Sequence, residues 1–516
     1  MTLPRWIAPG AIAFLAIWLL LMAAGNTTML RDPGTFWHTH TGELILKDGF
    51  TRTDQYTFTH PAFADRWWIS AQWLGEMGMV ALHRISGFDG EFLGAVTLLA
   101  VTFAWLTVRL LRTGLHPVAV GTLVSLALAA AGSHFHVRPH LGTITGMAFT
   151  AAMLTDCDMG QLRLRHLFWL VPAFVIWVNV HGGYLGGFGS VVIVGSGWVV
   201  AWWLKRPTPV ESWRDVWLLA VLFVGCGAAA LVNPYGTDML RIWSVIMDEP
   251  LLRQIIQEHR PFEFDEPYAV PAIVFAAVYL FLLAGLNWRD IRVSWLLPIV
   301  WMAQTVGRCR HVSLFVVVGL VAIAAMWPHT RWAKWLAANR PDFYEPSAAP
   351  LPRPWWASVW LPTLVVLLTL GLQADGVRVP VFGAGWAVHT EPHWPMDVLD
   401  ALKEHEPRPG DPHNKIFNDY IDGAFVIYHA PGYRVFVDDR CEVFGGQWLY
   451  DFVLASHPEK TSPEKRAATM AKWQSDYGNF DFALTRTTSP FDDYFKTSPE
   501  WECVKRTENS AFYRRR

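Results

Sequence analysis

The sequence predicts a polytopic α-helical membrane protein with a C-terminal soluble α/β domain. Charged residues make up only 17% of the 516 residues, against roughly 25% in ordinary soluble proteins. Almost half of the charged residues follow Asp375, and the part before it contains repeated apolar stretches. The chain is therefore expected to consist of a transmembrane domain, residues 1–373, and a water-facing domain, residues 374–516.

About eleven apolar stretches can cross a hydrocarbon core of roughly 30 Å, because a helix rises about 1.5 Å per residue and satisfies its own backbone. They lie at 6–24, 92–111, 118–132, 141–154, 167–180, 185–203, 216–232, 269–286, 293–306, 313–327 and 356–372. The first stretch follows Arg5 and ends in Met-Ala-Ala-Gly at 22–25, which also fits a cleaved signal peptide. Both interpretations of this stretch stay open.

Lys and Arg residues predict the orientation, because short loops rich in them favour the cytoplasmic side of a membrane. They recur in every second loop, as Arg109, Arg112, Arg163, Arg165, Lys205, Arg206, Arg214, Arg289, Arg292, Arg331, Lys334, Arg340 and Arg353. With an odd number of spans, the N-terminus is expected in the cytoplasm and the C-terminal domain on the outer face.

Charge balance and cysteine content exclude two classes of protein. Lys and Arg (42) nearly equal Asp and Glu (44), so the chain has no positive field that would gather nucleic acid. Five cysteines in a chain of this size are too few for a disulfide scaffold. Cys441 and Cys503 both fall in the domain expected outside, which leaves a bridge between them open.

The first outer loop, residues 26–90, is expected to contain structure of its own. Asp32 follows the first span directly, and residues 37–46 have helical apolar spacing. Residues 67–85 combine Trp and Met side chains with Glu76 and Arg84, which favours an amphipathic helix lying at the membrane interface.

Polar side chains gather in the loops expected on the outer face. The clusters are Asp32, Trp37, His38, His40, Asp54 and Asp65; His134, His136, Arg138 and His140; Asn179, His181, Gly182 and Gly183; Asn233, Pro234, Tyr235 and Gly236; Glu258, His259, Arg260 and Glu263; and Arg308, Arg310 and His311. Ionisable groups near a bilayer are costly, so this one-sided clustering favours an outward-facing active site or binding cleft. The alternative is that outer loops need polar side chains for solvation alone.

Several of these residues give the chain a resemblance to a known superfamily. They are residues 31–38 (Arg-Asp-Pro-Gly-Thr-Phe-Trp-His) with Gly42 and Asp54, residues 73–74, residues 177–183 (Trp-Val-Asn-Val-His-Gly-Gly), residues 233–236 and residues 310–311. The chain resembles the GT-C membrane glycosyltransferases, in a bacterial GT-C-like branch with a C-terminal periplasmic domain. The resemblance implies a multi-pass protein of the bacterial inner membrane that uses a polyprenyl-phosphate sugar donor. Many relatives carry two adjacent acidic residues, whereas Pro33 follows Asp32 here.

Sugar transfer to an acceptor hydroxyl, inverting in this interpretation, needs a base and positive charge on the departing phosphate. Asp32 is the candidate base, and its alternative role is to cap a helix that starts near Pro33. The candidate phosphate ligands are Arg138, Arg260, Arg308 and Arg310, because a guanidinium binds phosphate oxygens in pairs. Each arginine could instead pair with Glu258, Glu263 or a lipid headgroup.

Contacts to the sugar or acceptor are expected from further outer residues, namely Trp37, His38, Asp54, His136, Asn179, His181 and Glu258. The histidines His38, His40, His134, His136 and His140 leave a divalent metal open as a cofactor. Their His-x-His spacing is unspecific, so hydrogen bonding is the favoured role and no metal site is predicted.

The terminal domain alternates strand and helix signals. Strands are expected at 415–417, 434–437 and 481–484, helices at 420–429, 447–455 and 463–475, and a closing hairpin from 501–505 and 512–515. Residues 418–423 loosely resemble an aromatic-Asp-Tyr-Gly element of oligosaccharyltransferases. Asp419, Tyr420, Asp439 and Arg440 are therefore candidates for acceptor recognition, with structural pairing between loops as the alternative.

Three functions compete. The favoured one is a lipid-phosphate-sugar glycosyltransferase, whose acceptor could be a glycan, a lipid or a protein. A non-catalytic membrane protein whose outer domain binds cell-envelope glycan or protein is the second. A transporter of a lipid-linked sugar is the third, and it is disfavoured because few polar residues fall in the middle of the spans.

Overall fold

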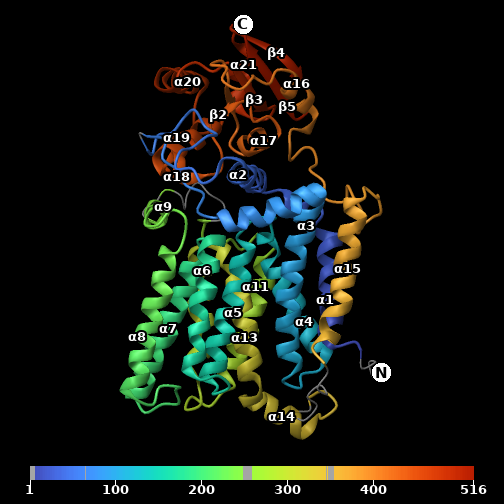
Figure 1. Ribbon diagram of the computed structural model, residues 1–516, viewed down its shortest axis with the longest axis vertical. Helices are drawn as coiled ribbons and strands as arrows, with labels where there is room; N and C mark the ends of the chain where they lie inside the picture. Colours follow the sequence, from blue (N-terminus) through green and yellow to red (C-terminus); the bar gives the residue numbers. More distant parts are fainter. Residues whose placement is uncertain (1–5, 64, 248–250, 252–258, 345, 347–353) are drawn as a thin grey trace. The chain divides into compact units, whose positions relative to one another are not determined.

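The computed structural model describes residues 6–63, 65–247, 251, 259–344, 346 and 354–516 (Figure 1). It divides into two compact units. Unit 1 comprises Met1–Asn26, Ile85–Gly236 and Glu258–Trp386, and unit 2 comprises Thr27–Arg84, Thr237–Gln257 and Ala387–Arg516. Neither unit is continuous in sequence, because most of the first loop belongs with the C-terminal domain rather than with the helices that flank it.

Unit 1 is a bundle of apolar helices lying side by side (Figure 1). They are α1 (Pro9–Gly25), the second half of α3 (Trp73–Leu111), α4 (Pro117–Ala131), α5 (Leu141–Asp158), α6 (Leu170–Val180), α7 (Tyr184–Trp203), α8 (Trp213–Ala228), α11 (Ala269–Ala284), α12 (Leu297–Gly307), α13 (Val312–Met326) and α15 (Trp356–Ala374). The short helix α14 (Arg331–Asn339), which contains Arg331 and Lys334, lies at one end of this bundle (Figure 1). Short 3-10 turns extend several of these: η2 (Gly132–His134), η3 (Leu164–Trp169), η4 (Ala229–Leu231), η6 (Val293–Leu296), η7 (Cys309–His311) and η8 (Trp327–His329).

Helix α13 forms the centre of unit 1. Its sequence is apolar on every side, and almost all of its residues are buried, as expected for a helix surrounded by others. It packs against α4, α5, α11 and α12. At the periphery, α15 packs on α1 and α8 leaves large apolar side chains exposed.

The predicted membrane stretches are helical, and the chain is a multi-pass membrane protein in its helical part. Each expected stretch coincides with a helix or with a helix and its 3-10 turn. By length and composition, six helices of the described residues can cross a membrane: Trp73–Leu111, Pro117–His134, Tyr184–Trp203, Trp213–Leu231, Cys309–His329 and Trp356–Ala374. Four shorter helices are also apolar: Pro9–Gly25, Leu164–Val180, Ala269–Ala284 and Val293–Gly307.

Unit 2 contains a five-stranded mixed sheet in the order β2-β1-β3-β5-β4. Its strands are β1 (Lys415–Asn418), β2 (Arg434–Val435), β3 (Phe482–Arg486), β4 (Trp501–Arg506) and β5 (Ser510–Arg515). Strands β2, β1 and β3 run parallel, whereas β5 is antiparallel to both β3 and β4. The helices of the unit are η1 (Thr28–Leu30), α2 (Gly34–Asp48), the first half of α3, α9 (Asp238–Met247), η9 (Met396–Val398), α16 (Leu399–Glu404), α17 (Asp422–His429), α18 (Cys441–Phe444), α19 (Gly446–Ser456), α20 (Pro463–Tyr477) and α21 (Pro490–Thr497).

The first loop is built into unit 2. Helix α2 packs on α17, and Tyr428 of α17 lies 2.8 Å from the His83 ring. Further along the loop, the Val435 N–H donates to the Tyr56 carbonyl at 2.9 Å, and the Phe58 N–H donates to the Val435 carbonyl. The loop therefore covers the exposed edge of β2, which would otherwise present unpaired backbone groups.

Some expected elements differ in extent, and a bond that the sequence left open is absent. Strand β2 ends at Val435, two residues earlier than predicted, and the amphipathic helix begins at Trp73 rather than at residue 67. A kink at Ser86 and Gly87 then divides α3, where the chain passes from unit 2 to unit 1. The bridge left open between Cys441 and Cys503 is not formed, because both are free cysteines.

Gly423 in the first turn of α17 is expected to be intolerant of a side chain. A Cβ there would collide with the Val437 carbonyl oxygen, and backbone cannot rotate away as a side chain can. We expect Gly423→Ala to destabilise unit 2 by about 2 kcal/mol, within the range for overpacking a rigid site. Thermal unfolding in detergent measures this, with Gly78→Ala as the control because a Cβ at Gly78 meets nothing within 4 Å. Equal melting temperatures for the two variants would contradict the expectation.

Candidate functional site

In unit 1, most of the predicted basic and amide residues meet at one end of the bundle. Arg138 follows η2, His181 follows α6, and Arg310 lies in η7 before α13. The Cys309 N–H donates to the Arg260 carbonyl at 2.9 Å, which joins two of the predicted segments. The Arg310 guanidinium lies 2.9 Å from Nε2 of His259. Arg260 and the turn with Arg308 and Arg310 are therefore adjacent, and Arg138 lies in the segment between η2 and α5 at this end.

A hydrogen-bond chain orients His181 at the same end. The Gly183 N–H donates to Nδ1 of His181 at 3.0 Å, so Nδ1 is an acceptor and Nε2 carries the ring proton. Thr143 lies 2.8 Å from the same nitrogen and therefore donates its hydroxyl hydrogen. The indole N–H of Trp177 donates to Thr143 in turn. A Cβ at Gly183 would overlap the Thr143 side chain, which explains why this turn needs glycine.

The other predicted residues of unit 1 lie nearby but differ in their contacts. The amide nitrogen of Asn179 donates to the carbonyls of Val175 and Val232, which ties the end of α6 to the segment after η4. The His136 ring lies 6.2 Å from the His140 ring. Glu258 lies outside the described residues.

In unit 2, Asp32 sits at the start of α2. Its carboxylate accepts the Gly34 N–H at 2.8 Å, and its side chain is largely buried. The helix-capping contact considered for this residue is therefore present, and it fixes the orientation of the carboxylate. The contact is made by one carboxylate oxygen, Oδ1.

Trp37 and His38 of α2 lie in the interior of unit 2. Nδ1 of His38 lies 2.9 Å from Glu76 of α3, and both side chains are fully buried. Ser70 donates its hydroxyl to the other carboxylate oxygen of Glu76. Trp37 packs edge-on against Trp68. These contacts hold α2 and the first half of α3 together.

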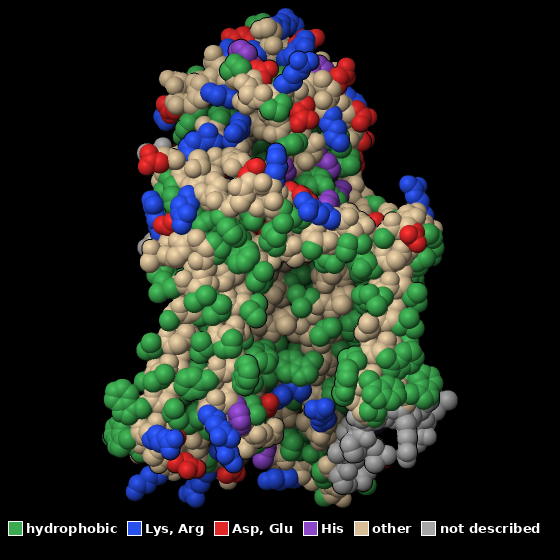
Figure 2. Space-filling view, in the orientation of Figure 1, with side chains coloured by type: hydrophobic (Ala, Val, Ile, Leu, Met, Phe, Trp, Pro, Cys, Tyr) green, Lys and Arg blue, Asp and Glu red, His purple; other side chains and the backbone are tan. Residues whose placement is uncertain are grey.

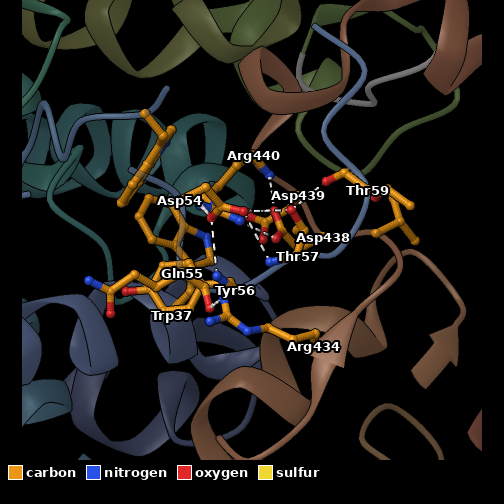
Figure 3. Close-up of polar contacts among 12 residues, drawn as sticks. Trp37, Asp54, Gln55, Tyr56, Thr57, Thr59, Arg434, Asp438, Asp439 and Arg440 are labelled. Atoms are coloured by element: carbon orange, nitrogen blue, oxygen red, sulfur yellow. Dashed lines mark hydrogen bonds and ion pairs between the residues drawn. The ribbon is translucent and has the colours of Figure 1, made fainter. Parts of the chain in front are cut away.

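Asp54 and Arg440 are partners in a buried ionic network (Figure 3). Nη1 of Arg440 donates to Asp54 at 2.7 Å, while Nε and Nη2 form a fork on Asp438 at 3.0 and 2.6 Å. The guanidinium also lies 4.7 Å from the ring centres of both Tyr56 and Trp68. Arg440 thereby joins the first loop to the segment that follows β2.

Electrostatics in this network keep both partners charged. Burial alone would raise the pKa of Asp54, but Arg440 and hydrogen bonds from Thr57 outweigh burial and lower it to about 2. Burial opposes the charge on Arg440, yet Asp438 and Asp54 outweigh it and raise the pKa of the guanidinium. Removing such a pair from water costs free energy, and close hydrogen bonds with good geometry offset that cost.

The carboxyl ends of β1 and β3 form a second polar group, centred on Arg486. Its guanidinium pairs with Asp422, and its backbone N–H donates to Asp419 at 2.8 Å. Ser489 donates to the other oxygen of Asp419. Burial raises the pKa of Asp419 to about 7 despite these hydrogen bonds. The pKa of this carboxyl group in unit 2 therefore lies close to neutral pH.

Arg486 also connects this group to the segment that carries Asp32. Its guanidinium donates to the carbonyls of Pro392 and His393. The His393 ring, through Nε2, lies 2.6 Å from the Arg31 carbonyl, and the Trp394 indole donates to the Leu30 carbonyl at 3.0 Å. The structure therefore brings the Asp32 segment and Asp419 into one connected network.

Tyr420 and Asp439, the remaining predicted residues, approach one another through Cys441. The Tyr420 hydroxyl lies 3.6 Å from Sγ of Cys441, and Sγ lies 3.4 Å from the Asp439 carbonyl. Burial raises the pKa of Tyr420 well above its ordinary value, so the phenol stays neutral.

Metal ligands are not gathered in the described part of the chain. Among those residues, no group of three or more His, Cys, Asp or Glu side chains could hold a metal ion. The five histidines considered as a set are divided, with His38 and His40 in unit 2 and His134, His136 and His140 in unit 1.

Sequence reasoning missed Glu76, His393 and Arg486 as members of these networks. Glu76 was assigned to the polar face of an interfacial helix, because an isolated carboxylate in an amphipathic pattern is usually solvated. Arg486 directly follows the apolar run of β3, and an arginine at the carboxyl end of a parallel strand was the available signal.

Comparisons with known proteins identify the fold. No protein-family model matches the chain, and no curated protein matches its sequence. Archaeal oligosaccharyltransferase AglB from Archaeoglobus fulgidus, in complex with an inhibitory peptide and a dolichol-phosphate, is similar in structure with a TM-score of 0.52 at 11% identity, over 93% of this chain and 69% of that chain. The A. fulgidus oligosaccharyltransferase tethered to an acceptor peptide with the NVT sequon gives a TM-score of 0.51 at 12% identity, over 93% and 68%. ArnT from Cupriavidus metallidurans in the apo state gives a TM-score of 0.50 at 14% identity, and the match covers 97% of this chain and 97% of that chain.

These similarities show that the chain has the GT-C fold, as the resemblance in its sequence indicated. The match extends over the helical part and the C-terminal domain together, since it covers nearly the whole chain.

Removal of Arg440 is expected to destabilise unit 2 in a pH-dependent way. Arg440→Met leaves Asp54 and Asp438 buried without a cation, which costs about 3–5 kcal/mol at neutral pH. Because the pKa of Asp54 is lowered in the folded protein, its pair contributes stability above the ordinary pKa near 4 and loses it as pH falls towards 2. The difference in melting temperature between wild type and variant should therefore shrink on acidification from pH 7 to pH 3.

The matched control for this experiment is Arg514→Met. Arg514 forms an exposed pair with Glu502, and such pairs contribute about 1 kcal/mol or less. Two results would contradict the expectation. One is a loss of melting temperature in Arg440→Met as small as that in the control, and the other is a loss that grows as the pH falls.

Proposed function

We propose that this protein is an integral-membrane glycosyltransferase that transfers a sugar from a polyprenyl-phosphate-linked donor to an acceptor hydroxyl. The observation that carries the proposal is the GT-C fold, which extends over 93% of this chain in the match to an oligosaccharyltransferase bound to a dolichol-phosphate. The reaction is placed on the outer face of a bacterial inner membrane, which the distribution of Lys and Arg in the loops favours.

The proposed step is an inverting displacement. The acceptor oxygen attacks the anomeric carbon, the bond from that carbon to the phosphate oxygen breaks, and the polyprenyl phosphate leaves as an anion. Asp32 takes the proton of the acceptor hydroxyl, a role in which a carboxylate contributes roughly 100- to 10,000-fold. The Gly34 N–H, 2.8 Å from the carboxylate, supports this role because it holds the group in one orientation.

The departing phosphate is proposed to bind at the arginine-rich end of unit 1. Arg138, Arg260, Arg308 and Arg310 supply positive charge there, and the Nε2 proton of His181 adds a hydrogen-bond donor. Fixed donors in a water-poor site stabilise negative charge as it develops. Asp419 and Tyr420 at the carboxyl end of β1 are the proposed acceptor contacts.

Asp32→Asn is expected to abolish transfer while leaving the fold intact. The amide keeps the hydrogen bond to Gly34 but cannot accept the acceptor proton. Labelled sugar transfer from a panel of polyprenyl-phosphate donors by the purified protein measures the loss, which should be at least about 100-fold. Asp65→Asn is the control, since Asp65 is an exposed carboxylate of the same loop. Undiminished transfer in Asp32→Asn would reject Asp32 as the base, and binding of intact donor without turnover in wild type would favour the non-catalytic alternative.

Arg310→Ala is expected to lower kcat/KM for the donor by roughly 100-fold, as removal of one fixed donor to a developing anion does. Arg310→Lys should restore part of this activity, because the charge returns without the planar fork. Steady-state kinetics against donor concentration measure both. Arg340→Ala is the matched control, since Arg340 forms an exposed pair with Asp342. A loss equal to that of the control would place the phosphate elsewhere.

A further inference from the structure

A second concentration of arginine and tryptophan lies at the opposite end of unit 1, around the end of α11. Here α14 begins against α11, since the Arg331 N–H donates to the Gly285 carbonyl at 2.8 Å. The loop after α11 continues through Trp288 and Arg289. We call Arg206, Trp288, Arg289, Arg331 and Trp332 the arginine–tryptophan cluster.

Each arginine of the cluster stacks on an indole ring. The guanidinium carbon of Arg206 lies 4.1 Å from the Trp288 ring centre, and that of Arg289 lies 5.4 Å from the same ring. Arg331 lies 4.2 Å from the Trp332 ring centre. Among the described residues, no carboxylate forms an ion pair with Arg206, Arg289 or Arg331, although Asp290 follows Arg289 in the chain.

Stacking leaves the arginines able to bind an anion. A guanidinium meets an aromatic ring with its flat face, and its N–H donors point outwards from its edge. That edge matches the paired oxygens of a phosphate. Two guanidinium groups beside one exposed indole therefore supply the donors that a phosphate group needs.

The surroundings of the cluster determine what carries this phosphate. Trp288 is 62% exposed, and large apolar side chains around this end are more exposed still: Trp203 at 80%, Trp217 at 72% and Trp213 at 71%. Figure 2 shows Lys and Arg side chains at this end of the helices, below a band of hydrophobic side chains. Trp at the edge of such a band is typical of the headgroup level of a membrane. A ligand that combines acyl chains with a phosphate satisfies both features, whereas a soluble anion satisfies only one.

We propose that the arginine–tryptophan cluster is a binding site for the phosphate headgroup of an anionic phospholipid. Arg206 and Arg289 hold the phosphate from around Trp288, and Arg331 on Trp332 extends the site along α14. The site lies at the end of the bundle away from Arg138 and Arg310, so it is independent of the proposed sugar transfer.

Native mass spectrometry of the full chain in detergent, titrated with phosphatidylglycerol or phosphatidylcholine, tests the site. We expect phosphatidylglycerol to bind more tightly, and the double variant Arg206→Gln/Arg289→Gln to lose about fivefold in affinity per arginine without a change for phosphatidylcholine. Arg340→Gln is the matched control, because Arg340 is exposed in the segment after α14 and already paired with Asp342. Equal affinity of wild type and double variant for phosphatidylglycerol would overturn the proposal.

Two further experiments distinguish a specific phosphate site from general electrostatic attraction to anionic lipid. Arg206→Lys/Arg289→Lys keeps the charge but loses the planar fork, so we expect it to bind phosphatidylglycerol more weakly than wild type. Full binding by the lysine variant would show that charge alone acts and would overturn the proposal. Excess inorganic phosphate should leave the lipid bound, whereas displacement by phosphate would identify a soluble anion as the ligand instead.

Discussion

The buried guanidinium of Arg440 is the interaction on which unit 2 depends. It holds Asp54 of the first loop and Asp438 of the C-terminal domain at once, and its faces contact Tyr56 and Trp68. A charge taken out of water is tolerated only when its partners satisfy it fully. The two stretches of chain that supply those partners are separated by more than 350 residues in sequence, so neither could bury its charges alone. This constraint explains why the loop and the terminal domain form one compact unit.

The same constraint gives a structural role to several residues that the sequence predicted as ligand contacts. Trp37, His38 and Asp54 are polar or aromatic groups of a long loop, and such groups are often part of a binding surface. In the structure each is engaged with the interior of unit 2. Asp32 also contacts the interior of unit 2, since its carboxylate accepts a hydrogen bond from the backbone of the helix that it starts.

The sequence was sufficient for the helices of unit 1 and for most of the terminal sheet, because both depend on local periodicity. Length and hydropathy locate α7 or α13 without knowledge of their neighbours, and the hairpin expected from 501–505 and 512–515 corresponds to β4 and β5. Contacts between residues far apart in the sequence could not be predicted, since nothing near Asp54 in the sequence indicates Arg440. The division of the chain into two units could not be predicted for the same reason. A charge count separates 1–373 from 374–516, but it cannot detect that residues 27–84 cover the edge of β2.

Arginine illustrates why composition alone could not assign roles in this chain. Arg440 and Arg206 both place the guanidinium face against an indole, at 4.7 Å from Trp68 and 4.1 Å from Trp288. They differ in what meets the edge of the guanidinium. In unit 2 the anions are Asp54 and Asp438 of the chain itself, and the result is a closed, buried network. At the end of α11 the chain supplies rings but no paired carboxylate among its described residues, so an anion from outside completes the arrangement. The rings differ as well, since Trp68 is buried whereas Trp288 is 62% exposed.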